Sequence, residues 1–235
     1  MALPQLNDTV QFEMTIPSLK KKVRYRPFLV KEEKNLMIAM ESKDNRSIMH
    51  TLLKTLKSCV EDDIAASKLC TFDVEYMFLQ IRSKSVGETS KVGMKCSECN
   101  TSSEVEINID DINIEVPDIE KTIQLTDKIS VELDWPTYAS LSELNLDGTS
   151  NTEELFKIMG QCFKSINTEE ERIDIKDVNR EEIQEFIESM SASQFTKIKD
   201  FIEAMPNLKH DVEFECNHCQ HQNKVTVEGL TGFLS

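Results

Sequence analysis

The sequence predicts an α+β protein, and three patterns support this prediction. Two segments with alternating apolar residues each contain a Cys-x-x-Cys, and the two copies, Cys96–Cys99 and Cys216–Cys219, lie 120 positions apart. A further alternating segment lies near the N-terminus, over residues 9–16. Apolar residues at helical spacing occupy much of the remaining chain. We therefore expect a discontinuous β module with helical insertions and an N-terminal β-hairpin.

The N-terminal region is expected to form the hairpin and then helices. Residues 9–16 alternate as a strand that ends at Pro17, and residues 22–26 can pair back with it. We assign residues 1–30 to this hairpin and residues 31–88 to a helical region. Three groups of apolar residues mark the inner faces of three helices there: Leu36, Ile38 and Met40; Ile48, Leu52, Leu53 and Leu56; and Val74, Met77, Phe78 and Ile81.

The two cysteine segments have the same plan, a strand, a tight cysteine turn and a second strand. Two such turns that face each other offer four thiolates to one tetrahedral zinc, as in a zinc ribbon. Residues 89–116 and 208–235 are therefore expected to form a zinc-ribbon-like module. We expect one structural zinc per chain, with ligands Cys96, Cys99, Cys216 and Cys219. His218 and His221 lie beside the second pair and could replace a cysteine as ligand, but the matched repeat favours four sulfurs and solvated histidines.

Other uses of the cysteines remain open but are less favoured. A redox Cys-x-x-Cys needs a helix start, where the helix dipole lowers the thiol pKa, and neither pair precedes a helical pattern. Disulfides need an oxidising compartment, and the first residues show no signal segment. Cys59, Cys70 and Cys162 fall in helical patterns and are expected in the core.

Residues 117–207 are expected to form a mainly helical insertion with a short β segment. Residues 122–134 alternate as one or two strands, and a short helix begins near Tyr138. Three helix starts follow, at the capping box Ser150-x-x-Glu153, at Asn179 and at Ser191-x-x-Gln194. The inward face of the first of these helices is expected to comprise Leu155, Ile158, Met159, Cys162, Phe163 and Ile166.

Composition and motifs exclude several classes of function. The net charge is −15, and the second cysteine segment is acidic, so nucleic-acid binding is not expected. No apolar run is long enough to cross a bilayer. The chain has no Gly-rich phosphate loop, no His-Glu-x-x-His and no Gly-x-Ser-x-Gly. We therefore expect no enzymatic activity, no small-molecule substrate and no membrane partner.

Two segments are candidates for protein contacts. Five basic residues lie at positions 20–26, and a solvated strand face or loop is the favoured interpretation of them. The alternative is that Lys20, Lys22 and Arg24 form a docking stripe for an acidic partner. The second candidate is the apolar C-terminal end with Phe233 and Leu234. This end either folds back on the β module or inserts into a neighbouring subunit.

Residues 25–34, Tyr-Arg-Pro-Phe-Leu-Val-Lys-Glu-Glu-Lys, followed by Met40-Glu41-Ser42, resemble the N-terminal segment of a baseplate protein family of contractile-tailed, T-even-type bacteriophages. The two cysteine pairs and the closing Gly-Leu-Thr-Gly-Phe-Leu match the same family. The resemblance implies a baseplate hub subunit or hub assembly protein without catalytic activity, whose partners are other hub or tail proteins. It also implies action in the host cytoplasm, where tails are built, and leaves open whether the protein stays in the virion.

Two other classes of function remain as alternatives. One is a zinc-ribbon interaction module that acts on transcription machinery. The other is a redox protein that uses Cys-x-x-Cys, which requires reactive thiols or an open metal position.

Overall fold

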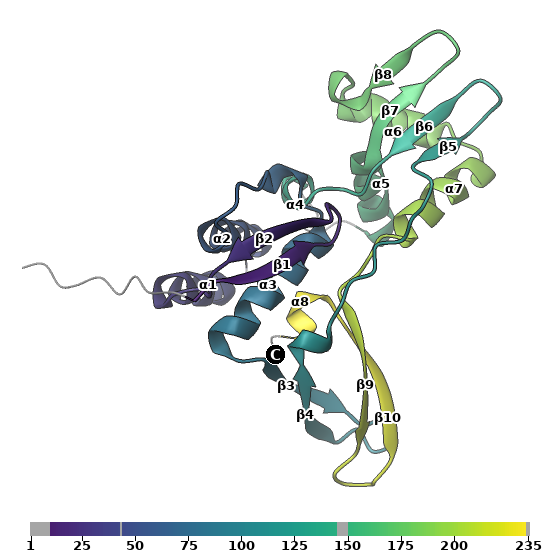
Figure 1. Ribbon diagram of the computed structural model, residues 1–235. Helices are drawn as coiled ribbons and strands as arrows, with labels where there is room; N and C mark the ends of the chain where they lie inside the picture. Colours follow the sequence, from purple (N-terminus) through teal and green to yellow (C-terminus); the bar gives the residue numbers. More distant parts are fainter. Residues whose placement is uncertain (1–9, 43, 145–149, 234–235) are drawn as a thin grey trace, which may run out of the picture. The chain divides into compact units, whose positions relative to one another are not determined.

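The computed structural model describes residues 10–42, 44–144 and 150–233, which form small sheets and helices (Figure 1). The chain divides into two compact units: unit 1 comprises Met1–Ala66, Phe72–Glu115 and Asn207–Ser235, and unit 2 comprises Ser67–Thr71 and Val116–Pro206. The helices of unit 1 are α1 (Val30–Ser42), α2 (Asn45–Cys59), α3 (Thr71–Val86) and α8 (Gly229–Gly232). Its strands are β1 (Phe12–Ile16), β2 (Lys21–Tyr25), β3 (Thr89–Lys95), β4 (Ser102–Asn108), β9 (Lys209–Glu215) and β10 (Gln222–Glu228).

The N-terminal hairpin forms as the alternation predicts. β1 and β2 pair antiparallel, with Met14 opposite Val23 and Phe12 opposite Tyr25. The apolar residues face inward, and Ile16, Val23 and Tyr25 are almost completely buried. The turn is fixed to the start of α3, because the buried Asp73 carboxylate accepts hydrogen bonds from the Ser18 backbone N–H (2.9 Å) and hydroxyl (2.5 Å).

Helix α3 is the central helix of unit 1. Apolar residues cover most of its circumference, which is the pattern of a helix buried on several sides. Val74, Met77, Leu79 and Ile81 have no exposed surface. Helix α2 begins at a capping residue, because the Asp44 carboxylate accepts hydrogen bonds from the N–H groups of residues 46 and 47.

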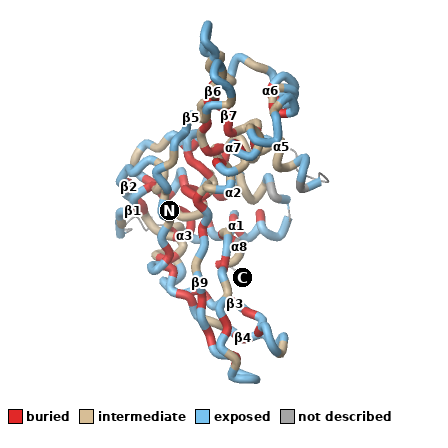
Figure 2. The backbone as a smooth tube through the Cα atoms, turned by 90° about the vertical axis from the view of Figure 1, so that its right-hand side faces the viewer, coloured by how far each residue is buried: buried red, intermediate tan, exposed pale blue. Residues whose placement is uncertain are grey.

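The two cysteine hairpins repeat each other at an offset of 120 residues throughout their length. β3 and β4 pair with the same register as β9 and β10, so that Thr89 faces Asn108 and Lys209 faces Glu228. The bases of the hairpins are closed alike, by Ile109 N–H to Glu88 O and by Gly229 N–H to Leu208 O, both at 2.8 Å. Buried or half-buried residues alternate with exposed ones along each strand (Figure 2).

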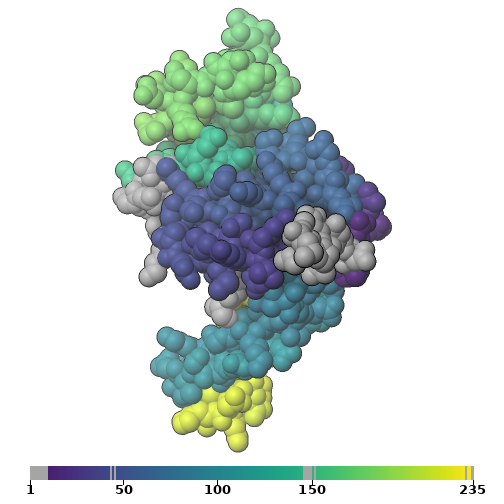
Figure 3. All heavy atoms as spheres, turned by 90° about the vertical axis from the view of Figure 1, so that its left-hand side faces the viewer, coloured from purple at the N-terminus to yellow at the C-terminus, as the bar shows by residue number. Residues whose placement is uncertain are grey.

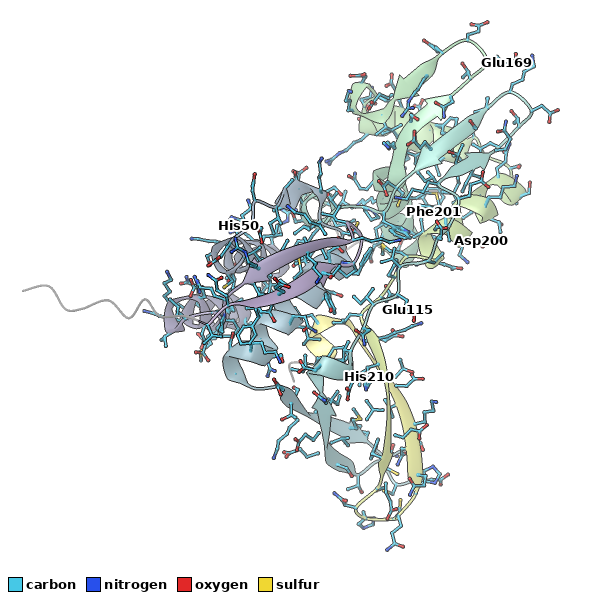
Figure 4. All side chains as sticks on the ribbon, in the orientation of Figure 1. His50, Glu115, Glu169, Asp200, Phe201 and His210 are labelled. Carbon is cyan, nitrogen blue, oxygen red and sulfur yellow. The ribbon has the colours of Figure 1, made fainter. Side chains whose placement is uncertain are left out.

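Unit 2 contains a four-stranded antiparallel sheet in the order β5-β6-β7-β8. Its strands are β5 (Thr122–Gln124), β6 (Ser130–Leu133), β7 (Phe163–Asn167) and β8 (Arg172–Asp174), and its helices are α4 (Tyr138–Ser142), α5 (Asn151–Cys162), α6 (Arg180–Glu188) and α7 (Ala192–Glu203). Short 3-10 turns lie at Ala66–Lys68, where the chain passes from unit 1 to unit 2, at Ile109–Asp111 after β4, and at Ile175–Asp177 after β8. Glu169 lies at the turn between β7 and β8 (Figure 4), where its carboxylate pairs with Lys128 at 3.1 Å.

The three predicted helix starts of unit 2 are confirmed. Ser150 with Glu153, Asn179 with Glu182, and Ser191 with Gln194 each form a reciprocal capping box. Aromatic pairs fill the space inside the unit. They are Trp135 with Phe201, Phe156 with Phe195, and Phe163 with Phe186, with ring centroids 6.2, 5.3 and 6.1 Å apart.

The prediction that one helix runs through Phe163 and Ile166 is wrong. α5 ends at Cys162, and the next five residues form β7 in the middle of the sheet. Phe163 and Ile166 continue the helical spacing of the apolar residues before them, which favours a helix. The alternation of a strand is hard to recognise here, because the buried residue that follows Phe163 in β7 is the polar Ser165.

Within the residues that the structure describes, every helix is too short or too polar to cross a membrane.

Candidate metal centre

The two Cys-x-x-Cys turns have the same backbone geometry. In the first turn the Asn100 N–H donates to Cys96 O (3.0 Å), and in the second the Gln220 N–H donates to Cys216 O (2.9 Å). Asn100 and Gln220 have positive φ angles of 56° and 60°. These left-handed residues close each turn and return the chain to the second strand.

The structure brings all four predicted cysteine ligands together. In Figure 3 the visible part of the second hairpin, in yellow, lies against the lower end of the first, in teal. Their sulfur atoms lie within 4.8 Å of one another. The closest pairs join the two turns: Cys96 Sγ lies 3.6 Å from Cys219 Sγ, and Cys99 Sγ lies 3.6 Å from Cys216 Sγ. In a tetrahedral zinc site with Zn–S bonds of about 2.3 Å, the sulfurs are about 3.8 Å apart. The cluster therefore has the size and the donor set of such a site.

The surroundings of the sulfurs lower the pKa of Cys96 and Cys216, which favours the thiolate form of these two cysteines, and raise the pKa of Cys219. The backbone N–H groups of Cys99 and Glu98 lower the pKa of Cys96 to about 6, with further help from the side chains of Cys219 and Asn223. The corresponding N–H groups of Cys219 and His218 lower the pKa of Cys216. The N–H of His221 acts in the same direction on Cys219, but burial and the three neighbouring sulfurs outweigh it and raise the pKa of Cys219 to about 12.

Four thiolates in so small a volume repel one another, and a divalent cation removes that repulsion. The arrangement therefore suits a closed four-sulfur metal centre, in which the protein fills every ligand position and leaves none for water or substrate.

The histidines are not part of the cluster. Among the described residues, the group of side chains that can share one ion here consists of the four cysteines. His218 contributes its backbone N–H to Cys216 Sγ at 3.5 Å. His50 and His210 lie on α2 and β9, outside this group (Figure 4). Cys59, Cys70 and Cys162 are buried and lie outside this cluster, as expected of core residues.

Asn223 is a residue of the centre that the sequence did not single out. It is buried, with 5% of its surface exposed, and its side chain touches both cysteine turns. The repeat itself is the signal that points to it, because Asn223 follows Cys219 at the distance at which Ser103 follows Cys99.

The candidate docking residues of the hairpin are exposed, and two of them already have partners within the chain. Lys20 lies in the turn with a φ of 49°. Lys22 lies 3.9 Å from the Glu13 carboxylate, and Arg24 lies 3.9 Å from that of Asp62. The lysine at position 22 keeps 78% of its side chain exposed and the arginine at position 24 keeps 56%.

The C-terminal end folds back on unit 1. Gly229 has a φ of 67°, which lets the chain turn sharply from β10 into α8. Phe233 is completely buried, and its carbonyl accepts a 2.6 Å hydrogen bond from the Ser90 hydroxyl. The backbone N–H of Leu230 donates to the Glu75 carboxylate on α3. Leu234 lies outside the described residues.

Residues 9–235 match the family described as "T4 bacteriophage base plate protein". The chain belongs to this family of phage baseplate proteins. It is similar to the baseplate hub assembly protein gp26 of Enterobacteria phage T4, with 23% identity over 225 residues that cover 95% of this chain and 97% of that protein. No solved structure matches the chain.

Proposed function

We propose that this protein is a non-enzymatic structural or assembly protein of a phage baseplate hub. The observation that supports this proposal is the match to a hub assembly protein along nearly the whole length of both chains. The partners are other hub or tail proteins. The protein acts in the host cytoplasm while the tail is built and, if it remains in the particle, in the tail baseplate.

The second part of the proposal is that Cys96, Cys99, Cys216 and Cys219 hold one structural zinc, so that the two hairpins form a zinc ribbon. Four sulfurs within 4.8 Å of one another support this assignment. Zinc holds together two hairpins that are far apart in sequence, and its binding free energy adds to the folding free energy. The metal supplies rigidity here, because the four thiolates complete its coordination.

The proposed contact surface is the exposed side of the β1–β2 hairpin with Lys20, Lys22 and Arg24. Asp73 fixes the hairpin turn to α3, so this basic surface is held in one orientation. For the C-terminal end, the complete burial of Phe233 favours the alternative in which it anchors the tail within its own chain.

The proposal is tested by removing the protein from a phage infection. Without it, cells should accumulate hub and tail precursors that do not join into complete baseplates, and the protein supplied in trans should restore them. A variant without the four cysteines should fail to restore assembly at raised temperature. Normal baseplates in the absence of the protein would contradict the proposed role.

A further inference from the structure

The two halves of the metal centre share their backbone geometry but differ in the side-chain contacts of the equivalent residues Ser103 and Asn223. Each turn surrounds its first cysteine sulfur with two backbone N–H groups, from Glu98 and Cys99 at Cys96 and from His218 and Cys219 at Cys216. The backbone bonds that close the two turns are also equivalent. Asn223, however, corresponds to Ser103, and these two side chains have different surroundings.

Asn223 connects the two turns through every hydrogen-bonding position of its amide. Its Oδ1 accepts from the Ser97 N–H and from the Ser97 hydroxyl, both at 3.0 Å. Its Nδ2 donates to the Cys96 sulfur at 3.6 Å and to the His221 carbonyl at 3.0 Å. An amide can accept two hydrogen bonds and donate two, so this buried side chain is fully paired. Asn223 and Ser97 are 126 residues apart in the chain.

Ser103 occupies the equivalent place on β4 and makes no such connection. It is equally buried, with 4% of its surface exposed, and its hydroxyl finds no hydrogen-bond partner among the described residues. Cys216 therefore lacks the side-chain donor that Cys96 has. The two half-sites are alike in their backbone hydrogen bonds, and the contacts of Asn223 are present in one of them and not in the other.

We propose that Asn223 is a positioning residue of the metal centre, which fixes the first cysteine turn against the second and orients the Cys96 sulfur toward the ion. The inference rests on the proposed zinc site. Asn223 touches no metal itself and acts through Cys96 and Ser97. Groups that hold metal ligands from outside the coordination sphere typically change metal affinity by roughly 10–100-fold when they are removed.

The test is the substitution Asn223→Ser in the full chain. Serine fits this place in the fold, because the repeat already carries Ser103 at the equivalent position. We expect zinc affinity, measured by competition with a chromophoric chelator, to fall by roughly 10–100-fold. We also expect the difference in melting temperature between zinc-loaded and zinc-free protein to shrink, because the zinc-loaded protein should lose more stability than the zinc-free protein.

Two further variants separate positioning from general destabilisation. Ser103→Ala is the matched control: it alters the equivalent position, where the hydroxyl is unpaired, and should leave zinc affinity unchanged. Asn223→Asp keeps the acceptor for Ser97 but loses the donor to Cys96, so it should also weaken zinc binding. The cobalt-substituted protein offers a second readout, since the thiolate-to-cobalt absorption band should change in both Asn223 variants and not in Ser103→Ala.

Equal zinc affinity and an unchanged cobalt band in Asn223→Ser and wild type would overturn the inference. So would an equal loss of melting temperature with and without zinc, because that result would make Asn223 an ordinary core contact. Wild-type protein that binds no zinc in the competition assay would instead refute the zinc site itself.

Discussion

Arg26 and Glu32 form an almost fully enclosed ion pair, with 3.1 Å between the guanidinium Nη2 and the carboxylate Oε1. The arginine also donates to the carbonyl oxygens of Pro27 and Ser58, each at 2.9 Å. The second carboxylate oxygen accepts from the Leu29 N–H at 2.8 Å, at the start of α1. This network joins the end of the β1–β2 hairpin to both α1 and α2.

The Arg26 network gives a structural reason for the segment that resembles the phage baseplate family. Residues 25–34 contain the arginine, the proline that follows it and the glutamate that pairs with it. Tyr25 is 2% exposed and bridges to Val60 after α2. The segment is therefore expected to maintain the fold of unit 1 by holding the hairpin against α1 and α2.

The first prediction concerns the charge of Glu32. Glu32→Gln should lower the free energy of unfolding by on the order of 3 kcal/mol at neutral pH, because it leaves the Arg26 charge enclosed without a counter-ion. Urea denaturation measures this loss. Glu33→Gln is the matched control, since Glu33 is the exposed neighbour on the same helix and its substitution should change stability by less than about 1 kcal/mol.

The same pair predicts a pH dependence. Burial raises the pKa of Glu32, but the Leu29 N–H and the Arg26 guanidinium outweigh burial and hold the pKa below its ordinary value of 4.5. An acid with a lowered pKa in the folded state contributes stability above its unfolded pKa and loses it as the pH falls through the folded value. Wild-type stability should therefore fall more steeply than that of Glu32→Gln below about pH 4.5. Parallel curves for the two proteins would contradict the pair's role.

The sequence predicts the parts of the fold whose signals are local. Each capping box places its helix start correctly because its two residues satisfy each other's backbone groups. The two cysteine segments are predicted as hairpins because apolar residues alternate on both sides of each Cys-x-x-Cys, and because both copies of the repeat show this same pattern. β7 is missed because Ser165 interrupts the alternation of apolar residues. The hydrogen bonds that Ser97 donates to Asn223 could not be predicted from local sequence, because the two residues are 126 positions apart.

The second prediction is that purified protein contains about one zinc per chain, as the four-ligand rule requires. Cys216→Ser should release the metal and loosen both hairpins, because each turn supplies half of the ligands. Elemental analysis and hydrogen exchange in residues 89–108 and 209–228 measure the two effects. Cys70→Ala, which removes a buried thiol outside the cluster, should keep the zinc. Loosening of the second hairpin alone would show that the two pairs do not share a metal.

The third prediction tests the C-terminal end. Phe233→Ala should lower the free energy of unfolding by about 3–5 kcal/mol, because it empties a fully buried aromatic site. Thermal and urea unfolding measure this loss. Loss of hub assembly with an unchanged melting temperature would instead place Phe233 in an interface with a partner.

The fourth prediction concerns Glu75, whose carboxylate accepts from the Leu230 N–H. Burial raises the pKa of Glu75 above its ordinary 4.5, against the lowering effect of that hydrogen bond. An acid with a raised pKa in the folded state contributes stability below its unfolded pKa and loses it as the pH rises through the folded value. Glu75→Gln keeps an acceptor for Leu230 and removes the buried charge. The variant should be more stable than wild type at pH 8, and the difference should vanish near pH 4. A variant that is less stable at pH 8 would show that the charged form is needed.

The last prediction is that the basic hairpin acts in association and contributes little to stability. Lys20→Glu, Lys22→Glu and Arg24→Glu together should leave the protein folded, with a loss of at most a few kcal/mol, because exposed ion pairs such as those with Glu13 and Asp62 contribute about 0–1 kcal/mol each. The triple variant should bind its hub partner more weakly, and the difference from wild type should be largest at low salt, where screening is least.

A matched triple variant changes three exposed residues of unit 2, Lys128, Lys164 and Lys176, to glutamate. It makes the same change in net charge as the hairpin variant but leaves the hairpin itself intact. If the hairpin is the contact surface, only the first variant should lower the association rate, because steering depends on where the charge lies as well as on how much there is. Equal slowing by both variants would show that net charge alone governs the encounter. Normal binding by both variants would show that the hairpin is not the contact surface.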